Sequence, residues 1–192
     1  MKRIIAPWSK VSRERSGAMG PSRVMVIVAL MFAALVTSSL AWAQNSHFVR
    51  SGTAGVGDDG DLVCSGWKIA GLGSTPVEDT VTCSANGTAI YACINHGGNH
   101  PSASNKETVS GPVSGSGTFL SGKNGTISGS VSAEAPGPGT FSCPPGQDFV
   151  LASVSYTGIT LSDSLGATAN IAGAAEACLL SGELAQDPTL CP

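Results

Sequence analysis

From residue 44 onward the chain alternates short apolar and polar runs, and it shows no long amphipathic helical period. Such runs, separated by Gly, Pro and Asn-Gly, are typical of a β-sandwich or a barrel. The pattern predicts strands at 61–70, 77–85, 88–94, 117–121, 126–133, 148–156, 158–161 and 167–172. We therefore expect an all-β fold, a single disulfide-stapled antiparallel β-sandwich of the immunoglobulin-like or Greek-key type.

Three turns are predicted between these strands. Asn86-Gly87 and Asn124-Gly125 each lie between alternating runs, and Asn-Gly is preferred where both turn residues of a hairpin need positive φ. The segment from Asp163 to Gly166 is a third candidate hairpin loop. These turns define where neighbouring strands are expected to pair.

Two longer stretches are expected to be loops, at 95–105 and 135–146. The second holds Pro136, Pro138, Pro144 and Pro145, and such a density of proline excludes a central strand. The C-terminal tail is uncertain, because 174–180 fits either a last strand or a short helix.

The first 43 residues predict a secretory signal peptide. Positive residues precede an apolar run from Val24 to Val36, and Ala41-Trp42-Ala43 fits the pattern for cleavage after Ala43. The run is shorter than the ~20 residues that a membrane-spanning helix needs, which disfavours a retained anchor. The sequence thus predicts a signal peptide, 1–43, and a secreted domain, 44–192, without membrane contact after cleavage.

Removal of the signal peptide makes the domain acidic. Six of the ten Lys and Arg residues and one of the 13 acidic residues lie in 1–43, which leaves a net charge of 4 − 12 = −8. A phosphate backbone or an anionic membrane attracts clustered Lys and Arg, and the domain has no such cluster. We therefore expect no nucleic-acid partner, and an extracellular partner or ligand that the sequence does not identify.

All six cysteines lie in the predicted domain: Cys64, Cys83, Cys93, Cys143, Cys178 and Cys191. An even number in an exported chain predicts disulfides, and no pair has the close C-x-x-C spacing of a metal site. A hairpin closed over 71–76 would place Cys64 opposite Cys83. Cys178 and Cys191 are neighbours in the tail. A second hairpin at Asn86-Gly87 would turn Cys93 to the other face from Cys83, so elimination pairs Cys93 with Cys143, as one of 15 connectivities.

Two segments have distinctive amino-acid sequences. Residues 91–101 are YACINHGGNHP and continue to Asn105-Lys106-Glu107, and residues 141–147 are FSCPPGQ, followed by VSYT at 154–157 and LSD at 161–163. Together they resemble a group of small exported bacterial β-rich proteins without an assigned activity, over roughly residues 61–172. The resemblance implies cysteines equivalent to Cys93 and Cys143, and it carries no catalytic or binding role.

The loop after residue 95 holds the candidate metal ligands. His96 and His100 lie four residues apart, and Glu107 or His47 would complete three ligands for Zn²⁺. The Gly-Gly pair between the histidines and the proline after them oppose a helix, which favours a tight surface loop.

A second polar segment lies near the start of the domain. Residues 55–60 match G-x-G-x-x-G in letters, but they precede a strand and carry two carboxylates, which disfavours a dinucleotide site. Asp58, Asp59 and Asp61 are candidate Ca²⁺ ligands, although a solvated acidic turn is favoured. Trp67 alternates with Val63 and Ile69 and is expected in the core rather than on a sugar-stacking face.

These patterns contain no catalytic motif, and G-x-S-x-G is missing from the chain. The favoured hypothesis is a secreted or cell-surface module without enzymatic activity, used for binding or structure, and without a cofactor. The alternative is a metal-dependent extracellular hydrolase that uses the His96/His100 loop.

Overall fold

The computed structural model describes residues 45–97 and 105–192. Contacts divide the chain into Met1–Ala43 and Gln44–Pro192, and the fold below belongs to the second part. The predicted signal peptide and His100 lie outside the described residues. Within the described ranges, none of the helical segments has the length and apolar character needed to cross a bilayer.

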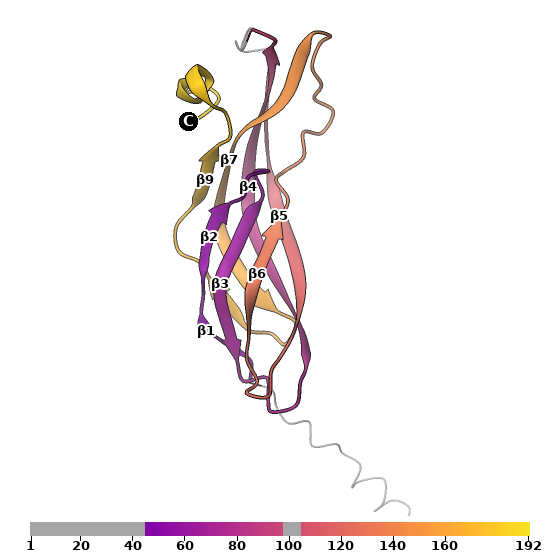
Figure 1. Ribbon diagram of the computed structural model, residues 1–192, viewed down its shortest axis with the longest axis vertical. Helices are drawn as coiled ribbons and strands as arrows, with labels where there is room; N and C mark the ends of the chain where they lie inside the picture. The colour runs from indigo at the N-terminus through magenta and orange to yellow at the C-terminus, as the bar shows by residue number, and fades with distance from the viewer. Residues whose placement is uncertain (1–44, 98–104) are drawn as a thin grey trace, which may run out of the picture. The chain divides into compact units, whose positions relative to one another are not determined.

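The described residues form two antiparallel sheets (Figure 1). In the first sheet, β3 lies between β6 on one side and β1 and β2 on the other; the strands are β1 (His47–Arg50), β2 (Thr53–Val56), β3 (Leu62–Ala70) and β6 (Ile127–Ala133). In the second sheet the order is β5-β4-β7, with β8 and β9 along the far side of β7; the strands are β4 (Glu78–Asn95), β5 (Lys106–Leu120), β7 (Gln147–Asp163), β8 (Thr168–Asn170) and β9 (Ala175–Cys178). A short 3-10 helix, η2 (Gly182–Gln186), follows β9. The predicted all-β class is confirmed.

The two sheets share one hydrophobic core, because alternate side chains of a strand point to opposite faces of its sheet. Leu62, Cys64 and Ile69 of β3 are fully buried against Val81 and Cys83 of β4. Trp67 is also fully buried, and its ring meets Phe119 edge-on with centroids 4.9 Å apart. The predicted core position of Trp67 is confirmed.

The predicted hairpin turn at Asn86-Gly87 is wrong, because both residues lie inside the 18-residue strand β4. Asn86 pairs with Pro112 of β5 and with Thr157 of β7. A Cβ atom at Gly87 would meet the rings of Pro136 and Tyr156 at 3.0 Å. The glycine at 87 therefore permits close packing inside a strand and does not serve a turn.

The predicted hairpin over 71–76 is also wrong, because β3 and β4 belong to different sheets. This connection crosses from the first sheet to the second. A turn forms at Asn124-Gly125, with Gly125 at φ 63° and a 2.9 Å hydrogen bond from its N–H to Gly122 O, but the hairpin predicted there is wrong because β5 and β6 do not pair. It too joins strands of different sheets, β5 and β6. The loop from Asp163 to Gly166 joins β7 to β8 as a hairpin, as predicted.

Other strands differ from the prediction in length. The segments 148–156 and 158–161 are one strand, β7, in which Gly158 has φ 62° at an irregularity in the pairing with β4. β5 begins at Lys106, well before the expected 117, and β1 and β2 were not predicted. The tail segment 174–180, for which the sequence fits either a strand or a short helix, contains the short strand β9.

The three disulfides pair as predicted: Cys64–Cys83, Cys93–Cys143 and Cys178–Cys191. The reason for the first pair is different, since Cys64 and Cys83 face each other across the core from different sheets, with Cα atoms 6.2 Å apart. The expectation that Cys83 and Cys93 lie on opposite faces rested on the wrong hairpin. They lie in one strand, where ten residues span ~33 Å, and this distance prevents their pairing.

Candidate functional site

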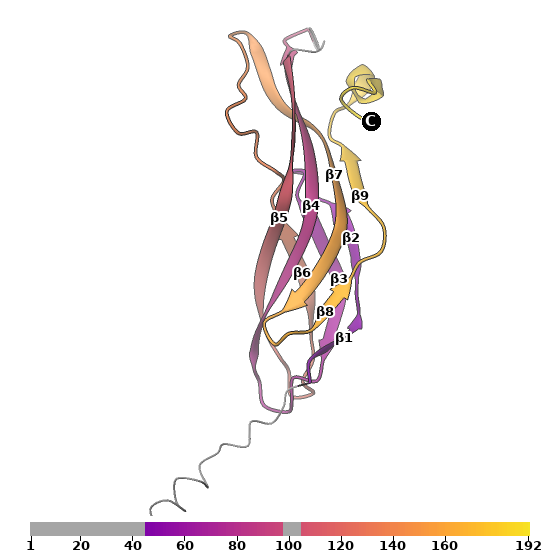
Figure 2. The ribbon, with the colours of Figure 1, turned by 180° about the vertical axis from the view of Figure 1, so that it is seen from behind.

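One end of the second sheet continues past the first sheet, as Figures 1 and 2 both show. This end consists of residues 91–95 of β4, 106–109 of β5 with Asn105 before them, and 147–151 of β7, and we call it the distal arm. The two segments with distinctive sequences, which begin at residues 91 and 141, meet here, because Cys93 of the first is bonded to Cys143 of the second. The distal arm therefore brings together side chains from both segments.

The loop of residues 135–146, which holds four prolines and which we call the proline-rich loop, covers the inner face of the distal arm. This is the face that is continuous with the core. The Tyr91 hydroxyl group donates a 2.8 Å hydrogen bond to Pro136 O, and the Cys93–Cys143 disulfide fixes the loop further along. Pro136 is buried in this contact. A loop held by a disulfide, a buried hydrogen bond and several prolines loses little further conformational entropy when a ligand binds.

Three aromatic rings gather on this inner face. Phe149 of β7 stacks on Tyr91, with centroids 5.3 Å apart and ring planes at 16°. Phe141 of the proline-rich loop lies 6.0 Å from Phe149 at a tilt of 48°. Tyr91 is buried, Phe141 is half-buried and Phe149 is 45% exposed. The cluster therefore presents part of an aromatic surface to solvent.

Amide side chains border the aromatic cluster. Asn105 directly precedes β5 and Gln147 begins β7, on either side of β4, and Asn105 Nδ2 donates a 3.2 Å hydrogen bond to Gln147 Oε1. Glu107 pairs with Tyr91 in the ladder and is exposed. We call the three rings and these two amides the distal platform.

His96 lies at the tip, where its Nε2 atom is 3.7 Å from Asp148 Oδ1, with both side chains largely exposed. Of the predicted metal ligands, His47 lies at the other end of the domain, where its Nδ1 atom is 2.9 Å from Asn45 O. Glu107 lies in β5, and His100 lies outside the described residues. Within residues 45–97 and 105–192, no three His, Cys, Asp or Glu side chains gather as a metal group.

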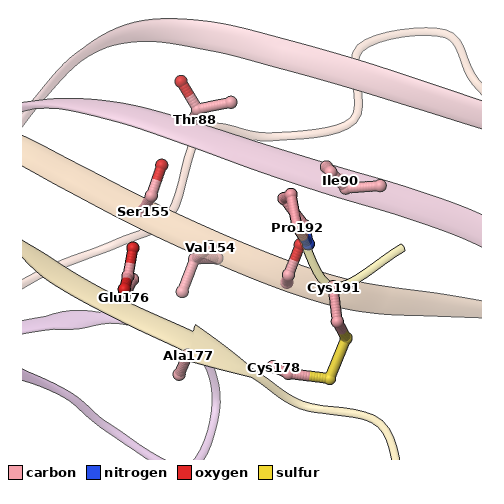
Figure 3. Close-up of a pocket in the computed structure, with 10 residues that line it drawn as sticks. Thr88, Ile90, Val154, Ser155, Glu176, Ala177, Cys178, Cys191 and Pro192 are labelled. Atoms are coloured by element: carbon pink, nitrogen blue, oxygen red, sulfur yellow. A yellow bond between two sulfur atoms is a disulfide. The ribbon is translucent and has the colours of Figure 1, made fainter. Parts of the chain in front are cut away.

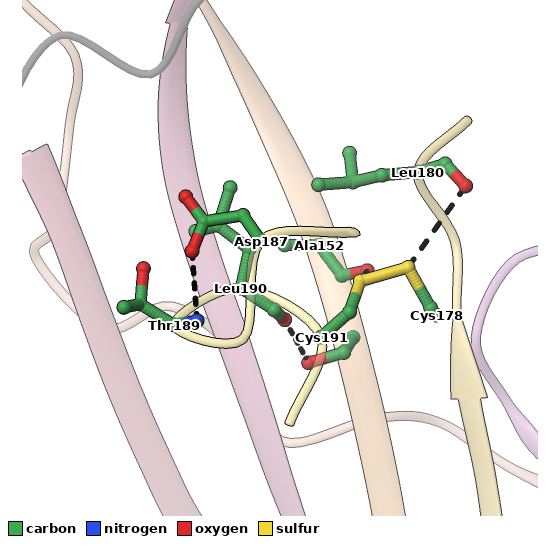
Figure 4. Close-up of a disulfide and its surroundings, with 8 residues drawn as sticks. Ala152, Cys178, Leu180, Asp187, Thr189, Leu190 and Cys191 are labelled. Carbon is green, nitrogen blue, oxygen red and sulfur yellow. Dashed lines mark hydrogen bonds between the residues drawn. A yellow bond between two sulfur atoms is a disulfide. The ribbon is translucent and has the colours of Figure 1, made fainter. Parts of the chain in front are cut away.

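The C-terminal segment covers the opposite face of the distal arm. Leu190 is fully buried in a second apolar cluster with Ala92, Ile94 and Ala152. The Ser153 hydroxyl group donates a 2.6 Å hydrogen bond to Leu190 O, and the Cys178–Cys191 disulfide closes the segment (Figure 4). The Lys106 ammonium group donates to Thr189 O at 2.9 Å. The distal arm is therefore held from both sides.

A hollow of about 440 Å³ lies between the C-terminal segment and the second sheet (Figure 3). Thr88, Ser155 and Glu176 line one part of it, and Cys191 and Pro192 lie over another. Its walls combine hydroxyl groups, one carboxylate and apolar atoms, but they contain no aromatic ring. The lining of the hollow is more apolar than polar, and none of its residues belongs to the distal platform.

The predicted calcium ligands occupy the turn between β2 and β3. Gly57 N donates to Asp61 O at 2.8 Å and Gly60 N donates to Gly57 O at 3.0 Å, which closes a tight hairpin. Asp58 and Asp59 are exposed and Asp61 is half-buried. This geometry is that of the solvated acidic turn favoured from the sequence.

The titration of the two tyrosines is shifted by their surroundings. Burial raises the pKa of Tyr91. Burial, together with the negative charge of Asp61 and the neighbouring Tyr91, raises the pKa of Tyr156 to about 12. Both hydroxyl groups therefore remain protonated donors at neutral pH and serve as structural hydrogen-bond groups.

Sequence reasoning did not identify Phe149, Phe141 or the amides of Asn105 and Gln147 as a group. These residues come from three separate strands and loops, and the distances between them depend on where the first sheet ends. The available signal was the pairing of Cys93 with Cys143, which brings both segments together. No protein-family model, curated protein or solved structure matches this chain.

Proposed function

We propose that the protein is a secreted or cell-surface β-sandwich module without enzymatic activity, and that the distal platform is its contact surface. The signal-like leader and three disulfides support a location outside the cytoplasm. The strand orders β2-β3-β6 and β5-β4-β7-β9 support an immunoglobulin-like, Greek-key arrangement. Such sandwiches carry loops at the ends of a rigid scaffold, where binding residues commonly lie.

The exposed ring of Phe149 is the observation that carries the proposal. Val49, Leu120 and Leu165 are exposed as well, and single exposed apolar side chains need no functional explanation. Phe149 differs because it belongs to a cluster of three rings on an arm held by two disulfides. Rigid aromatic side chains dominate the binding energy of many interfaces because little entropy is lost on contact.

The proposal is tested by the retention of labelled protein, residues 44–192, on envelopes from the organism that makes it. We expect Phe149→Ser to weaken retention at least ~10-fold, the equivalent of about 1.4 kcal/mol. Leu165→Ser is the matched control, because Leu165 is 40% exposed and lies in the β7–β8 loop. Equal retention of both variants and the parent protein would contradict the proposal.

The alternative function remains a metal-dependent hydrolase that uses His96 and His100. The 3.7 Å approach of His96 Nε2 to Asp148 Oδ1 supports it, because it brings a second oxygen or nitrogen ligand to the tip. Stoichiometric zinc in the purified protein, lost in the double variant His96→Ala/His100→Ala, would favour this alternative over the binding module.

A further inference from the structure

We infer that the ligand of the distal platform is a neutral glycan. This inference rests on the proposed function and names the class of molecule that the platform takes. It depends on three features of the described residues: an exposed aromatic surface, a hydrogen-bonded pair of amide side chains on the same face of the arm, and an acidic net charge.

The aromatic surface suits the apolar side of a sugar ring. Phe149 is 45% exposed and is backed by Tyr91, whose hydroxyl group is held by Pro136 O. An aromatic face carries partial negative charge and attracts the weakly positive C–H groups of a sugar. Because Tyr91 and the disulfide-tied loop fix the ring, the stacking surface exists before the ligand arrives.

The amides suit sugar hydroxyl groups, which both donate and accept hydrogen bonds. The bond from Asn105 Nδ2 to Gln147 Oε1 orients both side chains. An amide has two N–H donors and an oxygen that accepts two bonds. That bond uses the nitrogen of Asn105 and the oxygen of Gln147, and within the described residues it leaves Gln147 Nε2 and Asn105 Oδ1 without a second side-chain partner.

The charge around the platform favours a neutral ligand over an anionic one. Glu107 is an exposed carboxylate on the same face of the sheet as Tyr91, while Asp148, also exposed, points to the opposite face. The Lys106 ammonium group is held by Thr189 O on the opposite side of the arm. The chain after residue 43 carries a net charge of −8, from four basic and 12 acidic residues. Uronic or sulfated polysaccharides would be repelled by this field, whereas a neutral chain would not.

The experiment combines direct titration and competition. Soluble cello- and chito-oligosaccharides are titrated into the protein, residues 44–192, and are also used to displace it from envelopes. We expect binding that Phe149→Ser and Gln147→Ala each weaken at least ~10-fold. Asn170→Ala, in β8 on another part of the second sheet, is the matched amide control and should bind as the parent protein does. Thermal unfolding of each variant shows whether the fold is retained.

The outcomes distinguish a failure of the glycan inference from a failure of the proposed function. Retention on envelopes that depends on Phe149, is lost after protease treatment of the envelopes and is not displaced by either oligosaccharide would overturn the glycan inference and leave the binding module standing. Retention that is independent of Phe149 would overturn both. Displacement by the neutral oligosaccharides but not by polygalacturonate, with retention unaffected by protease, is the expected result.

Discussion

Tyr156 connects the two sheets at the level of a single side chain. It is fully buried in β7, and its hydroxyl group donates a 2.6 Å hydrogen bond to Gly60 O in the turn between β2 and β3. A buried hydroxyl group without a partner costs about 1–3 kcal/mol. The bond to Gly60 therefore removes a penalty and positions the edge hairpin of the first sheet.

The raised pKa of Tyr156 predicts a loss of stability at alkaline pH. Its folded pKa of about 12 lies above the value of 10.0 for an unshifted tyrosine. Below pH 10 both states keep the proton, and stability is complete. Between pH 10 and 12 the unfolded chain releases the proton and the folded protein retains it, so the free energy of unfolding falls, by at most about 1.4 kcal/mol per pH unit from this group.

Two measurements check this prediction. Absorbance titration of tyrosinate should show both tyrosines ionising later than a free tyrosine, and urea unfolding should show declining stability over the same range. Tyr156→Phe should remove most of the pH dependence. Ionisation of both residues near pH 10 in the folded protein would contradict it.

Residue-level predictions from sequence succeeded where a local pattern decided the outcome. Trp67 is predicted in the core from its alternation with Val63 and Ile69, and the structure buries it fully, although a register shift between Ser65 and Trp67 leaves Val63 outside the buried set. Gly87 was misassigned because Asn-Gly has a strong turn preference, while the space beside Pro136 and Tyr156 is a tertiary property. The exposure of Phe149 could not be predicted from a local sequence pattern. It depends on the second sheet continuing past the end of the first sheet, which leaves the Phe149 side chain uncovered.

The C-terminal segment shows how one element depends on a disulfide. Between Cys178 and Cys191 it contains only η2 and a few turns, and its one fully buried side chain is Leu190. Burial of such a side chain contributes roughly 1.5–3 kcal/mol, which is comparable to the entropy of ordering only a few residues. The segment therefore needs its covalent closure to stay in place.

We predict that Cys178–Cys191 is the first disulfide to be reduced. Cys178 is exposed and Cys191 is half-buried, whereas Cys64, Cys83 and Cys93 have no exposed surface. Thiol–disulfide exchange requires access of the attacking thiolate to a sulfur atom. Limited dithiothreitol treatment followed by alkylation and peptide mapping should label 178 and 191 before the other positions. Prior labelling of Cys93 or Cys143 would show that access does not set the order.

Strand prediction failed where neighbouring elements override local signals. The two long strands β4 and β7 were each divided at a glycine, although ladder pairing continues across Gly87 and around Gly158. β1 and β2 are short and lie at an edge, where the apolar pattern is weak. A turn that is closed by its own hydrogen bonds is easier to predict from sequence. In the loop from Asp163 to Gly166, Asp163 Oδ1 accepts from Leu165 N at 3.1 Å and from Ala167 N at 2.6 Å.

At the scale of the domain, the Cys64–Cys83 disulfide joins the two sheets through the middle of the core. The predicted pairing was correct although the predicted hairpin was wrong, because an inward cysteine on each strand suits either geometry. What the sequence did not contain was the assignment of β3 and β4 to different sheets. That assignment depends on β6 and β7 completing the two sheets from later in the chain.

Removal of this bond should destabilise the whole domain. The two cysteines are 19 residues apart, and closing a loop of this size contributes about 2–4 kcal/mol. We expect Cys64→Ala/Cys83→Ala to lower the free energy of urea unfolding by this amount in a single transition. The control Cys178→Ala/Cys191→Ala should cost less, since it frees only the tail. An equal or greater loss in the control would contradict this ranking.

The length of β4 determines how the platform can be presented. The strand runs from Glu78, near the crossing between the sheets, to Asn95 at the tip, and its 18 residues span roughly 55–60 Å. Asn45 lies beside Gly71 at the end of the domain opposite the distal arm. Pro192 lies close to the distal arm. Immobilisation through the N-terminal end would therefore place the platform at the end of the domain farthest from the attachment point. A fusion at Pro192 would begin close to the distal arm, on the face opposite the platform.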